Sequence, residues 1–134
     1  PYLGVCLHGA SEVEKQLLLK NQDKRLEAFV VWVPELGAHE NNVADATRLV
    51  PDTRASHYWD PNEALGAAYG HLLPTPAAAW DVYMLFGPDA TWPKSGMPMP
   101  AYWMHQLGGV TGAPRLDARV FASRAANLLG IHSP

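Results

Sequence analysis

Cysteine and charge are both scarce in this chain of 134 residues. The single cysteine, Cys6, has no internal partner, which excludes a disulfide-stabilised scaffold and leaves the redox compartment open. Charged residues make up 17% of the chain, the net charge is −3, and the only adjacent basic pair is Lys24-Arg25. Nucleic-acid binding needs clustered positive charge, so we expect no nucleic-acid partner.

Long apolar runs and common catalytic motifs are also missing. No run approaches the roughly 20 residues that cross a bilayer, so we expect no membrane span. The chain has no Gly-rich phosphate loop, no Gly-x-Ser-x-Gly elbow and no His-Glu-x-x-His motif. These absences argue against the enzyme classes that use those motifs, and we expect no cofactor and no resident metal. The compartment, cytoplasmic or periplasmic, stays open.

Hydrophobic residues, by contrast, make up 48% of the chain, which predicts one globular domain over residues 1–134. Helical spacing of apolar positions over 10–18 predicts a first helix, and the apolar run 29–33 predicts a strand covered on both faces. Residues 80–86 predict a second strand. The other expected elements are a short helix over 43–50 with Asn42 as N-cap, a helix opened by Asp60, a short return strand at 90–92, a helical turn at 102–107 and a closing helix capped by Asp117. This order predicts an α/β or α+β domain with a small sheet.

Cys6 falls, on this interpretation, at or just before the first turn of the first helix. The free N–H groups there favour an anion, so we expect the pKa of the Cys6 thiol to lie below that of a model thiol, about 8.5. The alternative is that Cys6 is a small buried core residue, because free cysteine is among the most buried residue types.

Four segments together resemble the thioredoxin-like superfamily, and most closely an uncharacterised bacterial branch of it. That branch carries Cys-Gly-x-Cys-Leu-x-Gly-Ala, Val-Val-Trp-Val-Pro, Asp-x-Arg-x-x-x-Tyr-Trp-Asp and Trp-Asp-Val-Tyr. Here the corresponding segments are residues 3–10, 30–34, 52–60 and 80–83. The resemblance implies a three-layer α/β sandwich with a small mixed sheet and a thiol-redox site.

The resemblance also implies roles for individual residues. Cys6 matches the second, resolving cysteine of the family motif, whereas Leu3 occupies the place of the first, attacking one. Dithiol exchange with a protein or peptide partner is therefore expected to be absent, and Leu3→Cys is expected to raise it. Pro74 or Pro76 would match the cis-proline of the superfamily. The surroundings of the site would be Leu3, Gly4, Val5, His8, Thr75 and Pro76.

The family has a central strand before its cysteine motif, and that first strand is missing from this chain. Its neighbours would be residues 26–33 and 80–86, which both read as buried. We expect the slot between them to be filled, because unpaired interior backbone groups are costly. The strand could come from residues before Pro1, from a second chain in a homo-oligomer, or be replaced by direct pairing of the two neighbours.

Two further constellations each have two interpretations. Arg54 and His57, with Asp52 and Asp60 nearby, could form an anion clamp with an acid or base. Alternatively they belong to a polar loop held by Arg–carboxylate pairs. The second set could supply soft ligands for Cu(I) or could be ordinary core residues: Cys6, His8, Met97, Met99, Met104 and His105.

The sequence thus leaves three functions open. The first is a thioredoxin-like thiol-redox protein with an altered site. The second is a non-catalytic module that binds a peptide or small ligand, and the third is a soft-metal carrier.

Overall fold

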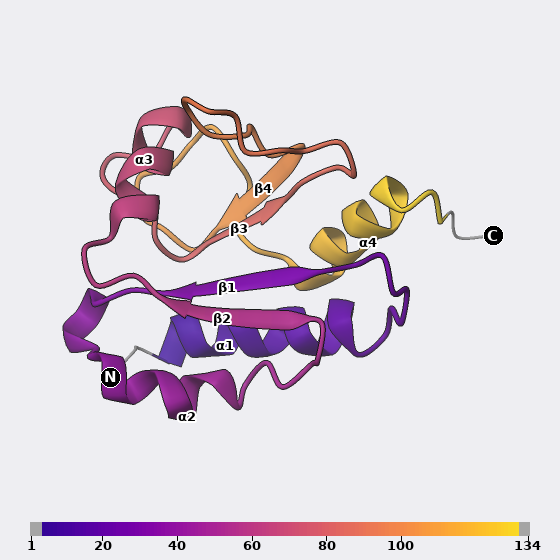
Figure 1. Cartoon of the computed structure of the whole chain (residues 1–134), viewed down its shortest axis with the longest axis horizontal. Coiled ribbons are helices and arrows are strands. Elements are labelled where there is room, and N and C mark those ends of the chain that lie inside the picture. The colour runs from indigo at the N-terminus through magenta and orange to yellow at the C-terminus, as the bar shows by residue number, and fades with distance from the viewer. Residues whose placement is uncertain (1–3, 132–134) are drawn as a thin grey trace.

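The structure, a computed structural model, describes residues 4–131 and is mixed α/β, as predicted (Figure 1). Its helices are α1 (Gly4–Val13), which runs directly into the π-helical turn η1 (Glu14–Leu18), then α2 (Val43–Thr47), α3 (Ala64–Leu72) and α4 (Ala118–Leu128). Two 3₁₀ turns, η2 (Glu35–Gly37) and η3 (Glu40–Asn42), precede α2. The strands are β1 (Ala28–Trp32), β2 (Ala55–Trp59), β3 (Val82–Leu85) and β4 (Tyr102–His105). Within this part of the chain, no helix combines the length and apolar character that a bilayer crossing requires.

The strands form two separate two-stranded sheets. β1 pairs with β2 in parallel, with Ala28 opposite Ala55, and β3 pairs with β4 in antiparallel, with Tyr83 opposite Met104. Among the described residues β1 has no other partner strand and neither has β3. The expected single mixed sheet is therefore wrong, and so is direct pairing of the two predicted strands. Residues 4–131 alone leave the slot between them without a strand.

One layer of helices nevertheless packs against both sheets. Leu17 and Leu18 of η1 lie in the same buried cluster as Phe121 of α4, Leu85 of β3 and Met104 of β4. Ala28 and Val30 of β1 and Ala55 of β2 pack against this cluster as well. The two sheets are thus held by a common core rather than by hydrogen bonds to each other.

The opposite faces of the two sheets differ. Tyr69 and Leu73 of α3 and its following loop cover the outer face of the β3–β4 sheet, where they meet Val82 and Met84. The three-layer arrangement holds there. On the β1–β2 sheet, Phe29 is 65% exposed and stacks on Tyr58, which is 51% exposed. The expected burial of this strand on both faces is therefore wrong, because no described element covers its outer face.

Two strands were not predicted from local sequence. Residues 55–59 were expected to be part of a polar loop, but they alternate between half-buried and exposed and form β2. Residues 102–107 were expected to make a helical turn, but β4 occupies 102–105, and the return strand expected at 90–92 is irregular. In both cases pairing with a distant strand decides the conformation.

The three expected helix N-caps have different outcomes, and only that of α4, the last helix, is confirmed in full. Asp117 caps α4 as expected, since its Oδ1 accepts from the N–H groups of Arg119 (3.0 Å) and Val120 (3.2 Å). Asn42 makes no side-chain cap to α2, contrary to expectation. α3 begins at Ala64 rather than directly after Asp60, although Asp60 Oδ2 still accepts from Leu65 N–H at 2.9 Å.

Candidate functional site

Cys6 lies inside the first turn of α1, because the helix begins at Gly4 rather than at Ala10. Its thiol donates a hydrogen bond to the carboxylate of Asp81, the residue just before β3, and the charge of Glu35, after β1, also acts on it. Asp81 has a left-handed backbone (φ 52°), a conformation that aspartate tolerates better than most residues. The cysteine is therefore held where α1 meets the end of one sheet and the start of the other.

The pKa of Cys6 is raised from 9.0 to about 12. Burial is the largest cause, followed by the hydrogen bond from the thiol to Asp81 and the negative charge of that carboxylate. The expected lowering of the pKa by the helix N-terminus is therefore wrong. A carboxylate beside a half-buried thiol disfavours the thiolate more than the helix end favours it.

Tyr83 and Gln106 continue the site from Asp81. The Tyr83 hydroxyl donates to Asp81 Oδ1 at 2.9 Å and lies 3.4 Å from Gln106 Oε1. Burial, and then the charge of Asp81, raise the pKa of Tyr83, so the hydroxyl remains a donor. Gly9 lets α1 approach this pair closely, since a Cβ at that position would collide with the Tyr83 hydroxyl and the Gln106 side chain.

A cavity of about 210 Å³ opens beside this group. It is bounded by α1, by the segment after β4 and by the start of α4. The residues that line it are His8, Gly9, Glu12, Gln106, Leu116 and Ala118. Its polar side chains come from α1 and from Gln106, and Leu116 and Ala118 supply an apolar wall. It can therefore hold a small group that both makes hydrogen bonds and packs.

The expected surroundings of Cys6 are only partly assembled. Gly4 and Val5 are the first residues of α1, and Leu3 lies outside the described residues. Thr75 Oγ1 donates to Ala77 O at 2.7 Å within the loop after α3, and Pro76 lies near Gly109 in the segment after β4.

No peptide bond in residues 4–131 is cis, so the match of Pro74 or Pro76 to the cis-proline is wrong. The residue that stands before β3 and touches the cysteine is Asp81. A proline-rich segment close to a strand was therefore a misleading signal, because the contact to Cys6 comes from the last residue before the strand, Asp81, and not from a proline.

All three guanidinium nitrogens of Arg54 donate hydrogen bonds to other groups of the protein. Its Nε and Nη2 bind the two oxygens of Asp52 at 3.0 and 2.8 Å, which holds the pKa of that carboxyl at about 2. The same guanidinium donates to three backbone carbonyls at 2.6–3.0 Å, those of Leu18, Asn21 and Asp23. These contacts favour the interpretation as a loop held by an Arg–carboxylate pair rather than as an anion clamp.

His57 is likewise occupied by structural contacts. Its Nδ1 accepts from Trp32 Nε1 at 3.1 Å, and its Nε2 lies 3.0 Å from Val50 O. An indole N–H can only donate, so the proton of the imidazole sits on Nε2 and points at the carbonyl. With both nitrogens bonded, the ring is not available as an acid or base for a ligand.

The soft-metal ligands are not gathered in one place. Met104 and His105 are buried, and both ring nitrogens of His105 bond backbone groups, Leu107 N–H at 3.0 Å and Ala113 O at 3.1 Å. Met97 packs against the Tyr69 cluster, whereas Met99 is exposed. In residues 4–131 no group of three histidine, cysteine or carboxylate side chains is arranged to hold an ion.

The raised pKa makes a direct prediction for the chemistry of Cys6. At pH 8 alkylation by iodoacetamide should be about a thousandfold slower than for a free thiol of pKa 9, because the thiolate fraction is lower by that factor. Asp81→Asn should speed the reaction, since it removes the charge while asparagine still tolerates the left-handed backbone. A midpoint of the rate against pH at or below 9 would contradict the geometry described here.

Sequence reasoning identified Cys6 and His8 but missed Asp81, Tyr83 and Gln106. Comparison of the chain with models of protein families, with curated proteins and with solved structures finds no match. The function must therefore be inferred from the site itself.

Proposed function

We propose that this protein is a non-catalytic binding module with a thioredoxin-like arrangement, and that it binds a small polar ligand or a peptide segment in the cavity lined by His8, Glu12 and Gln106. The proposal rests on the difference between the Cys6 thiol, which is held in a hydrogen bond, and the nearby cavity, which is open to a ligand. The Cys6 thiol is tied to Asp81 with a pKa of about 12, while the adjacent cavity is open and lined by polar side chains.

The same observation disfavours the alternative of a thiol-redox protein. Disulfide exchange needs an attacking thiolate and a second sulfur to resolve the mixed disulfide. The chain has one cysteine, and its thiolate is disfavoured at neutral pH. Cys6 in this role is a half-buried hydrogen-bond donor to the Asp81 carboxylate.

The lining of the cavity indicates the chemistry of the ligand. Glu12 contributes a carboxylate and Gln106 an amide, and the carboxylate of Asp81 lies next to Tyr83 behind them. His8 adds an imidazole to the lining, and Glu12 Oε1 lies 3.5 Å from Lys15 Nζ. The Glu12 carboxylate therefore favours a ligand that carries N–H donors or a positive charge able to compete with Lys15. Leu116 and Ala118 add a wall for a short aliphatic stem.

An NMR titration of the ¹⁵N-labelled chain with N-acetyl-lysine methylamide tests this proposal. We expect the amide signals of His8, Glu12 and Gln106 to shift together. Glu12→Gln should weaken binding about tenfold, as expected for loss of one charge-assisted hydrogen bond. Glu40→Gln, on exposed η3, is the matched control and should leave binding unchanged.

Shifts confined to another surface, or equal binding by the Glu12 and Glu40 variants, would overturn the cavity assignment. Insulin reduction by the unmodified chain would instead support the thiol-redox function.

A further inference from the structure

The outer face of the β1–β2 sheet carries a second cavity, separate from the one beside α1. Along β1 the side chains alternate, so Ala28 and Val30 pack on the buried cluster while Phe29 points to the opposite face. On β2 Ala55 packs inward in the same way, and Ser56, which stands opposite Phe29, is exposed. A large ring therefore lies next to a small side chain, and a cavity of about 260 Å³ opens there. The residues that line it are Lys24, Glu27, Phe29, Thr53, Arg54 and Ser56.

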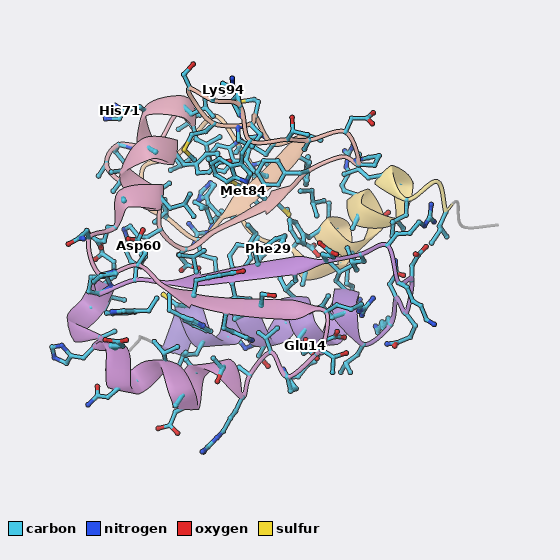
Figure 2. All side chains as sticks on the ribbon, viewed as in Figure 1. Glu14, Phe29, Asp60, His71, Met84 and Lys94 are labelled. Atoms are coloured by element: carbon cyan, nitrogen blue, oxygen red, sulfur yellow. The ribbon has the colours of Figure 1, made fainter. Side chains whose placement is uncertain are left out.

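The ring of Phe29 supplies the apolar wall of this cavity. Phe29, labelled in Figure 2, is 65% exposed, and its ring stacks on that of Tyr58 with centroids 6.4 Å apart and planes inclined by 26°. Tyr58 does not line the cavity, so it holds one face of the Phe29 ring and leaves the other face towards the cavity. A ring that is fixed on one face in this way is a surface on which a second aromatic ring can stack.

The cavity also contains one ammonium and one carboxylate that the fold does not use. Neither Lys24 nor Glu27 makes a hydrogen bond or ion pair within residues 4–131, and the two are not paired with each other. Arg54 differs from them, because its donors are bound to Asp52 and to backbone carbonyls. The charges left for a ligand are therefore one positive and one negative.

These charges and the size of the cavity restrict the ligand. A ligand with a single charge would leave either Lys24 or Glu27 without a partner, whereas a zwitterion matches both. The hydroxyls of Thr53 and Ser56 add groups that can donate to a carboxylate. A volume of about 260 Å³ is below the roughly 300–1,000 Å³ of pockets for drug-sized ligands. It suits a single amino acid rather than a longer peptide.

We propose that this cavity binds a free aromatic α-amino acid. The aromatic ring stacks on the open face of Phe29, the carboxylate accepts from the Lys24 ammonium and a neighbouring hydroxyl, and the ammonium donates to Glu27. This site goes beyond the proposed function, because it shares no residue with the cavity beside α1 and does not depend on ligand binding there.

NMR titration of the ¹⁵N-labelled chain with three indoles tests the proposal. L-tryptophan carries both charges, tryptamine lacks the carboxylate, and indole-3-propionate lacks the ammonium. We expect L-tryptophan to shift the amide signals of Lys24, Phe29 and Ser56 together. The other two indoles should bind about tenfold more weakly or less tightly still, because each loses one charge-assisted hydrogen bond.

Substitutions assign each part of the ligand to a residue. Phe29→Ala should weaken binding of L-tryptophan about fivefold, as expected for loss of an aromatic pair. Trp92→Ala is the matched control, since Trp92 is 63% exposed but does not line the cavity. Glu27→Gln should weaken binding of L-tryptophan and leave that of indole-3-propionate unchanged. Lys24→Gln should weaken binding of L-tryptophan and leave that of tryptamine unchanged.

Several results would overturn the proposal. They are a lack of L-tryptophan binding, equal affinity for the three indoles, equal effects of Phe29→Ala and Trp92→Ala, and signal shifts at His8 and Glu12 instead of at Lys24 and Phe29. The response of His8 and Glu12 to N-acetyl-lysine methylamide should persist in the Phe29→Ala variant. That measurement separates failure of this site from failure of the cavity beside α1.

Discussion

Arg54→Met is expected to lower the free energy of unfolding by about 3–5 kcal/mol. The guanidinium of Arg54 holds Asp52 and three backbone carbonyls at the junction between η1 and β2. Methionine keeps much of the stem volume but none of the donors. The substitution therefore leaves a carboxylate and several carbonyls unpaired in a region that is largely shielded from water.

Glu14 increases the expected loss of stability when Arg54 is replaced. This carboxyl, labelled in Figure 2, is only 4% exposed, and neither of its oxygens has a hydrogen-bond partner among the described residues. Burial, and then the charge of Asp52, raise the pKa of Glu14, while Arg54 opposes the rise. Because the pKa in the folded state is raised, ionised Glu14 costs stability as the pH rises above 4.5, and without Arg54 that cost grows.

Urea unfolding at two pH values measures both effects. Arg54→Met should lower the free energy of unfolding more at pH 7 than near pH 3. Near pH 3 Glu14 is protonated, and Asp52 has lost much of its contribution to the stability of the folded state. Arg48→Met is the matched control. Arg48 pairs with Asp45 at 3.2 Å, but the side chains are 80% and 82% exposed, so the expected change is about 0.5 kcal/mol or less. Equal effects of the two substitutions would contradict the anchoring role of Arg54.

Gly66→Ala should destabilise the protein by about 1–3 kcal/mol, although glycine to alanine in a helix usually gains about 1 kcal/mol. A Cβ at Gly66 would lie 2.5 Å from the carbonyl oxygen of Ala79, which is backbone and cannot rotate away. Ala79 N–H also donates to Gly66 O at 2.8 Å, so separation of the two segments breaks that bond. α3 would then shift from the β3–β4 sheet.

Gly87→Ala is the control for this prediction. A Cβ at Gly87 meets no atom within 4 Å, so we expect stability within about 0.5 kcal/mol of the parent. The midpoint of thermal unfolding distinguishes the two variants. A Gly66→Ala protein as stable as the Gly87→Ala protein would show that the approach of α3 to residue 79 is not as close as described.

Local sequence predicts the helices and strands whose apolar pattern or cap residues lie within, or directly next to, the segment itself. Strands β1 and β3 were found from their apolar runs, and α4 from Asp117 at its start and Gly130, which has φ 78°, after its end. β2 and β4 were missed because their partners are distant in the sequence. The candidate site shows the same limit. Cys6 was found, but its pKa is raised first by burial and then by Asp81, and both depend on parts of the chain distant from Cys6 in sequence.

The open edges of β1 and β3 also affect how copies of this chain behave together. Natural sheets protect exposed edges with lysine, proline or bulges, because an unprotected edge is a template for another strand. Neither Ala28–Trp32 nor Val82–Leu85 contains a lysine or a proline, and Phe29 adds an exposed aromatic ring beside one edge. Edge-to-edge association should therefore increase with protein concentration, because neither strand has a second partner among the described residues.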